Sequence, residues 1–253
     1  MSAILDAAKT LATDAVGNTA LYRCAAPEEV EALVGLGLDV HAKNTDSRTP
    51  LHSACSNGNL EVAQKLIAVG ADVNAKSNTD MTPLHSACSA GSLEVAQKLI
   101  AAGADLNARA IGGWTTLHYA CTHGHLELTQ TLIAAGAGVN AKTSDEGTTP
   151  LHWACINGRL EVAQALIAAG ADVHAKISSG GRTPLHFACS SGHPKLAQAL
   201  IAAGADVNAK SDTGKTPLDL CKTDETRALL LTPKERAPKD LLTALKELLA
   251  QYE

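Results

Sequence analysis

The chain reads Thr49-Pro-Leu-His-Ser-Ala-Cys-Ser-Asn-Gly58 and, one residue later, Leu60-Glu-Val-Ala-Gln-Lys-Leu-Ile-Ala-Val-Gly70. At intervals of 33, 33, 34 and 34 residues the same pattern returns with few changes, starting from Thr82, Thr115, Thr149 and Thr183. Self-similarity at a fixed period predicts stacked supersecondary units that contact only their neighbours, with no single central core. The 253 residues are therefore expected to form a solenoid.

Each unit is predicted to contain two short helices. Thr49 suits an N-cap and Pro50 the first helical position, so a first helix should run to about Asn57. Gly58 permits the positive φ that ends this helix, and a second helix should span residues 60–69 and close at Gly70. Residues 71–81 carry Asn, Asp and Ser in place of helix formers, which predicts a protruding turn before the next unit.

The period and the Thr-Pro-Leu-His-x-Ala run resemble the ankyrin-repeat family over roughly nine tenths of the chain. The resemblance implies an all-α fold, an ankyrin-repeat solenoid of stacked helix-turn-helix units with protruding turns or hairpins. We expect an ankyrin-repeat domain over residues 1–231. Its predicted parts are an N-terminal helix at 2–12, repeats at 14–43, 44–76, 77–109, 110–142, 143–176 and 177–210, and a truncated repeat at 211–231.

The terminal units depart from the pattern, as expected where one face has no neighbour to cover it. Asp219 replaces the usual His, and the second helix there should shrink to about residues 225–231. Residues 232–253 are predicted to form a linker and an amphipathic helix. This helix either folds back over the last repeat or binds a partner or a second copy.

Composition narrows the classes of partner. The net charge of -5 and the pI near 6.0 give no electrostatic reason to expect nucleic acid. No apolar run approaches the roughly 18 residues of a membrane span, and the first residues lack a secretory signal pattern. We expect a cytoplasmic monomer in a reducing compartment, with no membrane partner.

The seven cysteines follow the repeat. Five share one register, and two lie one position earlier in the terminal units: Cys55, Cys88, Cys121, Cys155 and Cys189, then Cys24 and Cys221. Stacked units lie about 10 Å apart, farther than the roughly 7 Å between Cα atoms that a disulfide tolerates. All seven are predicted to be free thiols, with the five registered ones buried.

Residues that could carry chemistry are repeated in every unit, which favours structural roles. The resemblance implies that the motif histidines are hydrogen-bonding residues near the turn: His52, His85, His118, His152 and His186. Cys121, His123 and His125 form the best candidate metal cluster, but their predicted directions diverge, so we expect no metal. No catalytic triad or phosphate loop is present, and we expect neither enzyme activity nor a cofactor.

Two further ladders are interpreted as structural. A cationic ladder, balanced by nearby carboxylates, is expected to be a solvated surface: Lys43, Lys76, Arg109, Lys142, Lys176 and Lys210. An asparagine ladder in the turn segments is predicted to support the fold: Asn74, Asn107, Asn140 and Asn208.

Positions that vary while the frame stays constant are free to serve recognition. The resemblance implies that the outward side of the first helices and the turn tips line a concave groove. Four of the six aromatic residues fall at such positions, and exposed aromatic residues commonly dominate binding. The predicted protein-binding residues are Trp114, Tyr119, His123, Trp153, Ile156, Phe187, Arg182, Met81 and Arg48. The alternative is that the aromatic rings pack against the neighbouring first helix.

Together these features predict a non-enzymatic scaffold or adaptor that binds a protein or peptide in the groove of its central and C-terminal repeats. Two alternatives stay open: a targeting or regulatory subunit that docks through its C-terminal helix, and a consensus-like scaffold with no native partner.

Overall fold

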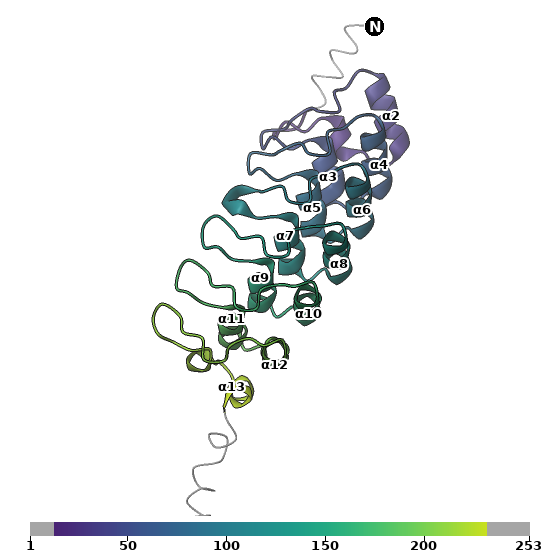
Figure 1. Cartoon of the computed structure of the whole chain (residues 1–253). Helices are drawn as coiled ribbons and strands as arrows, with labels where there is room; N and C mark the ends of the chain where they lie inside the picture. The colour runs from purple at the N-terminus through teal and green to yellow at the C-terminus, as the bar shows by residue number, and fades with distance from the viewer. Residues whose placement is uncertain (1–12, 232–253) are drawn as a thin grey trace, which may run out of the picture.

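The computed structural model describes residues 13–231. This part of the chain is all-helical and contains no strand, as predicted. The predicted helices at 2–12 and within 232–253 lie outside the described residues. The remaining units follow one another in a stack, with the two ends of the described chain at opposite ends of it (Figure 1).

Each unit contributes a first and a second helix. The first helices of the complete units are α3 (Pro50–Ser56), α5 (Pro83–Ala90), α7 (Thr116–His123), α9 (Pro150–Ile156) and α11 (Pro184–Ser191). The second helices are α2 (Pro27–Gly35), α4 (Leu60–Ala68), α6 (Leu93–Ala101), α8 (Leu126–Ala134), α10 (Leu160–Ala168), α12 (Pro194–Ala202) and α13 (Asp224–Leu230). In the terminal units the first helix is reduced to the 3-10 turns η1 (Ala20–Arg23) and η3 (Leu218–Leu220), and a third turn, η2 (Ile111–Gly113), precedes α7.

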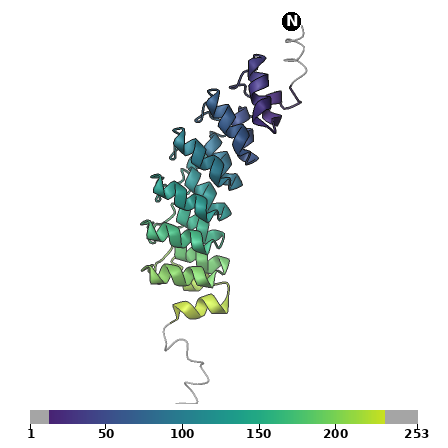
Figure 2. The same ribbon diagram turned by 90° about the vertical axis from the view of Figure 1, so that its right-hand side faces the viewer.

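The helices form two layers. Each first helix packs on the next first helix and on its own second helix, and the second helices form the outer layer. Seen from the side, the helix pairs follow a bent line (Figure 2). The loops between units project together from the side of the first helices (Figure 1).

We call these loops fingers and number them in chain order: residues 44–48, 77–81, 110–114, 143–148, 177–182 and 211–215. Each finger is closed by a hydrogen bond from its first N–H to its last carbonyl, as from Ser77 to Met81 at 3.0 Å. Each finger after the first is also joined to the preceding finger by a backbone bond, for example from Ser144 N–H to the Gly112 carbonyl at 2.7 Å. We call the surface formed by the fingers and the adjoining side of the first helices the finger–helix face.

The first helices begin as the sequence predicts. In every complete unit a Thr N-cap and the His three residues later form a reciprocal capping box, which satisfies backbone donors that a helix start leaves free. Glycine ends the turn between the helices because the backbone there needs a positive φ, which is 67° at Gly58 and 83° at Gly124.

The core is a continuous column of small and branched side chains. Each complete unit buries the Leu, Ala and Cys of its first helix together with a Leu of its second helix. All seven cysteines are free thiols and the five registered ones are buried, as predicted, while Cys24 and Cys221 are half-buried.

The two ladders connect neighbouring units. Asn140 donates to the Gly170 carbonyl at 3.1 Å and accepts from Asp172 N–H at 2.8 Å, and Asn74 makes the equivalent pair of bonds. These bonds confirm the structural role predicted for both asparagines. Three cations of the other ladder donate to a carbonyl one unit further on; they are Lys43, Arg109 and Lys176. Those cations therefore hold adjacent units together as well as meeting solvent.

Candidate functional site

The motif histidines fix the base of the finger–helix face. In each complete unit the N–H of the N-cap Thr donates to His Nδ1, as from Thr82 to His85 at 3.1 Å. Because Nδ1 accepts, the proton of the neutral ring is on Nε2, which can donate across the stack. It does so to the last carbonyl of the next finger in four units: His52 to Met81, His85 to Trp114, His118 to Thr148 and His186 to Lys215.

In the remaining complete unit, Nε2 of His152 is buried without a partner in hydrogen-bonding geometry within the part of the chain described. Burial lowers the pKa of His52, His85, His118 and His152 to about 4 and lowers that of His186. The rings are therefore neutral near pH 7, which the acceptor role of Nδ1 requires. This arrangement supports the structural role implied by the family resemblance.

The terminal units use other residues at the same position. Tyr22 occupies it in the first described unit, and its hydroxyl bonds the Arg48 carbonyl, the last carbonyl of the first finger. The same hydroxyl accepts from Asn44 N–H at 3.0 Å, and burial raises the pKa of Tyr22 to about 12. Asp219 accepts from the N–H and the hydroxyl of Thr216, but it makes no bond to a further finger within residues 13–231, where only α13 follows it. Sequence reasoning did not single out Tyr22, although its place in Thr19-Ala-Leu-Tyr22 is the signal.

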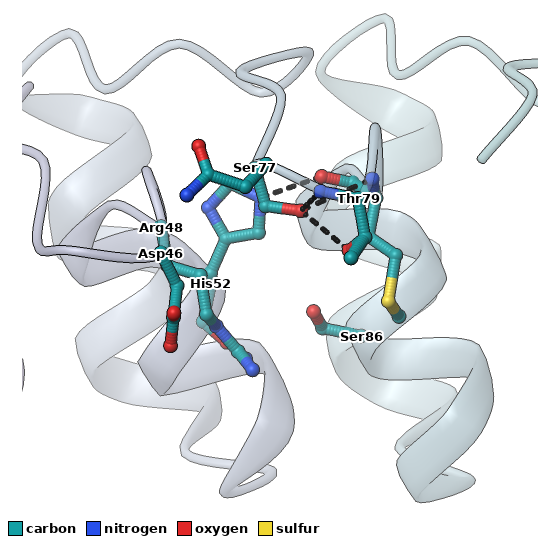
Figure 3. Close-up of a pocket in the computed structure, with 8 residues that line it drawn as sticks. Asp46, Arg48, His52, Ser77, Thr79 and Ser86 are labelled. Carbon is teal, nitrogen blue, oxygen red and sulfur yellow. Dashed lines mark hydrogen bonds between the residues drawn. The ribbon is translucent and has the colours of Figure 1, made fainter. Parts of the chain in front are cut away.

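The residue that ends each finger is thus held by its backbone while its side chain is free to vary. Arg48 and Met81 illustrate this at the N-terminal end. Both line a pocket of about 300 Å³ between the first two fingers, with His52, Ser77 and Ser86 at its walls (Figure 3). Arg48 also donates to the Ser56 hydroxyl at the end of the following helix, α3. This end of the face therefore carries mostly polar side chains and has no Trp, Tyr or Phe ring among the residues that line its pocket.

Three aromatic rings meet in the middle of the face. Trp114 ends the third finger, Tyr119 lies on α7 and Trp153 lies on α9. The Trp114 ring centroid is 4.5 Å from that of Trp153 and 5.2 Å from that of Tyr119. All three side chains are half-buried. We call these three residues the aromatic cluster.

The cluster is held in a defined geometry. Trp153 Nε1 donates to the Thr148 hydroxyl at 3.1 Å, and that hydroxyl is bonded in turn to the Thr143 hydroxyl. The Tyr119 ring stands edge-on to His85, with centroids 5.5 Å apart. Trp114 lies at the centre of the cluster because the end of a finger reaches both its own first helix and the next one.

The other predicted site residues lie apart from the cluster. The Phe187 ring is edge-on to His152 and packs against the core, and no ring contact joins it to Trp153 within residues 13–231. The exposed His123 stacks on His125 with centroids 5.8 Å apart. Among the nine predicted binding residues, ring contacts therefore join only the three of the aromatic cluster within residues 13–231. Ile156 is half-buried on α9, and Arg182 is exposed at the end of the fifth finger.

The candidate metal residues do not converge. Cys121 is buried with its Sγ 4.0 Å from the Thr129 hydroxyl, whereas His123 bonds the Tyr119 carbonyl at the surface. Over the described residues, no group of three His, Cys, Asp or Glu side chains is arranged to hold a metal ion.

Comparison with known proteins agrees with this geometry. The family model described as "Ankyrin repeats (3 copies)" matches residues 19–110 and 108–177, and "Ankyrin repeat" matches residues 180–212. The chain belongs to the ankyrin-repeat family. Ankyrin repeats are generally protein–protein interaction modules, typically without enzyme activity.

One solved ankyrin structure matches nearly the whole described part. The crystal structure of the human ASB11 ankyrin repeat domain superposes with a TM-score of 0.77 at 27% sequence identity, covering 85% of this chain and 99% of that one. A curated relative in sequence is the mouse "SMC5-SMC6 complex localization factor protein 1", 40% identical over 57 residues. That match spans 21% of this chain and only 5% of the mouse protein. Within residues 13–231, none of the ankyrin helices is long and apolar enough to cross a bilayer.

Proposed function

We propose that this ankyrin-repeat protein is a non-enzymatic scaffold or adaptor that binds a protein or peptide on its finger–helix face, with the aromatic cluster as the principal contact. It acts as a cytoplasmic monomer and binds neither nucleic acid nor membranes. The proposed repeat domain spans residues 1–231, and the predicted C-terminal segment, residues 232–253, lies outside the described residues. Met81, Arg48, Arg182 and Ile156 contribute at the margins of the bound segment.

The observation that carries the proposal is the position of the two indoles. Trp114 and Trp153 touch each other across two units, yet neither belongs to the set of side chains packed against the core, which includes Tyr119 and Phe187. Large aromatic side chains that are rigidly held but partly open give contact area at low entropic cost. Phe187 and, in part, Tyr119 support the fold, as the packing alternative requires.

The framework around the cluster favours binding without rearrangement. Trp114 is fixed through its backbone by the His85 bond to its carbonyl, and Trp153 is fixed by Thr148. A surface that is ordered before the partner arrives loses less conformational entropy on binding.

Site-specific photocrosslinking tests the proposal. A benzoylphenylalanine at position 156, beside Trp153 on α9, is expected to form an adduct with a partner in host cells. The matched control carries the same group at the exposed position 164 on α10, in the outer layer. Adducts from position 164 and none from position 156 would show that the interface lies outside the finger–helix face. Loss of all adducts on deletion of residues 232–253 would favour docking through the C-terminal helix instead.

A further inference from the structure

The strongest unassigned feature is the charge beside the aromatic cluster. The fourth finger carries two exposed carboxylates, Asp145 and Glu146, next to the third finger, which ends in Trp114. A Cβ placed on Gly112 would stand 3.3 Å from Trp114 Cδ1 and 3.8 Å from Asp145 Oδ2. An indole edge and a carboxylate therefore flank the same small space.

Both carboxylates lack a cationic partner within the part of the chain described, where the ion pairs involve other residues. The N–H of Glu146 bonds the Asp145 carboxylate at 2.7 Å and is the main reason why the pKa of Asp145 is lowered. One nearby cation, Arg109, directs its guanidinium to the carbonyls of Gly113 and Lys142. The negative charge of the fourth finger is thus available to a partner.

The cluster also offers unused hydrogen-bonding groups. Neither Trp114 Nε1 nor the Tyr119 hydroxyl has a hydrogen-bond partner among residues 13–231, in contrast to Trp153 Nε1. Half-buried Trp and Tyr side chains commonly direct these groups to a bound chain. Here they can bond the carbonyls of an extended segment.

We propose that the aromatic cluster, Asp145 and Glu146 form a binding site for an arginine side chain presented by an extended segment of a partner protein. A guanidinium matches the indoles and the carboxylates, because it stacks on aromatic rings, pairs with carboxylates and stays charged at neutral pH. The unused donors of the cluster are matched by the backbone carbonyls of the extended segment. This inference rests on the proposed function, which it deepens by naming the chemistry of the partner.

Intrinsic fluorescence gives a direct readout, because the chain has two tryptophans and both are in the cluster. The probe is the peptide acetyl-Gly-Ser-Arg-Ser-Gly-amide, compared with peptides that carry citrulline, leucine or glutamate at the central position. Citrulline keeps the shape of arginine and removes its charge. The arginine peptide should change the fluorescence saturably and bind about threefold or more tightly than the citrulline peptide.

Asp145→Asn should remove that preference, and the preference should weaken as salt is raised. The matched control is Asp212→Asn, which makes the same change in an exposed finger residue of the last unit, away from both tryptophans. It should leave binding of the arginine peptide unchanged. Both substitutions lie at the surface, so the fold is expected to tolerate them.

Three outcomes would overturn the inference: leucine or citrulline peptides that bind as tightly as the arginine peptide, an arginine preference that survives Asp145→Asn, or no saturable change with the arginine peptide up to about 10 mM. The photocrosslinking experiment at position 156 tests the proposed function separately. If that adduct forms while any of these outcomes holds, the finger–helix face is an interface that does not select arginine.

Discussion

Acidification from pH 7 to pH 5 should destabilise this protein strongly, because its motif histidines are buried in the neutral form. Burial lowers the pKa of His52, His85, His118 and His152 from 6.5 to about 4 in the folded state. A histidine whose pKa is lower in the folded than in the unfolded state contributes its full stabilisation at pH values above its unfolded pKa. That stabilisation is lost as the pH falls from about 6.5 towards 4.

The expected size follows from these values. At pH 5 an unfolded histidine is almost fully protonated and a folded one is about one-tenth protonated, which costs the fold about 2 kcal/mol per ring. Four such rings amount to about 8 kcal/mol, comparable with the whole stability of many domains. Carboxylates contribute little in this window because most stay ionised at pH 5 in either state.

Proton uptake on unfolding is the appropriate assay because long repeat arrays need not unfold in a single step. Unfolding in urea at pH 5 should take up about three to four protons through these histidines, and at pH 8 almost none. His85→Gln should reduce the uptake at pH 5 by about one proton. An uptake below one proton at pH 5, or no change in His85→Gln, would refute the buried neutral state of these rings.

Three further predictions concern the frame. Gly138→Asp should raise stability by about 0.5–1.5 kcal/mol. In five other units the Asp at this position accepts a hydrogen bond from the N–H of the residue two places later in the chain. A urea midpoint below that of the wild type would contradict this prediction. Asn140→Ala should lower stability by about 1–2 kcal/mol in the same urea titration, because it removes two hydrogen bonds to the next unit. Asn208→Ala should cost less, because the Asn208 side chain makes no such bonds to described residues. With a thiol reagent, the native protein should react first at the half-buried Cys24 and Cys221, because the five registered thiols are buried and out of reach, and all seven should react only after denaturation. Rapid reaction of all seven in the native state would show that the core is open.

Most of the fold could be predicted from the sequence because its determinants are local and repeated. Thr49, Pro50 and Gly58 set the helix starts and the turn by their own backbone chemistry, and the structure places them accordingly. The period of 33 to 34 residues then implies the stacking.

The site could be predicted only in part. The sequence identified Trp114, Tyr119, Trp153 and Phe187 as a group, but it could not show that a finger end reaches the first helix of the following unit. That crossing makes Trp114 the centre of the cluster and leaves Phe187 against His152. The position of Tyr22 within the motif is visible in the sequence, but only the structure shows that its phenol bonds the finger carbonyl as the imidazoles do.

The central claim is that the two indoles serve binding more than folding, and paired measurements on Trp153→Ala test it most directly. The affinity for the partner crosslinked at position 156 should fall by about thirtyfold or more, as for a buried interface anchor. The free energy of unfolding should fall by less than about 2 kcal/mol, because Trp153 lies outside the packed core and loses one hydrogen bond. Phe187→Ala, the matched control, should lower stability more and affinity less. Near-wild-type affinity of Trp153→Ala, together with a stability loss of about 3–5 kcal/mol, would contradict the claim.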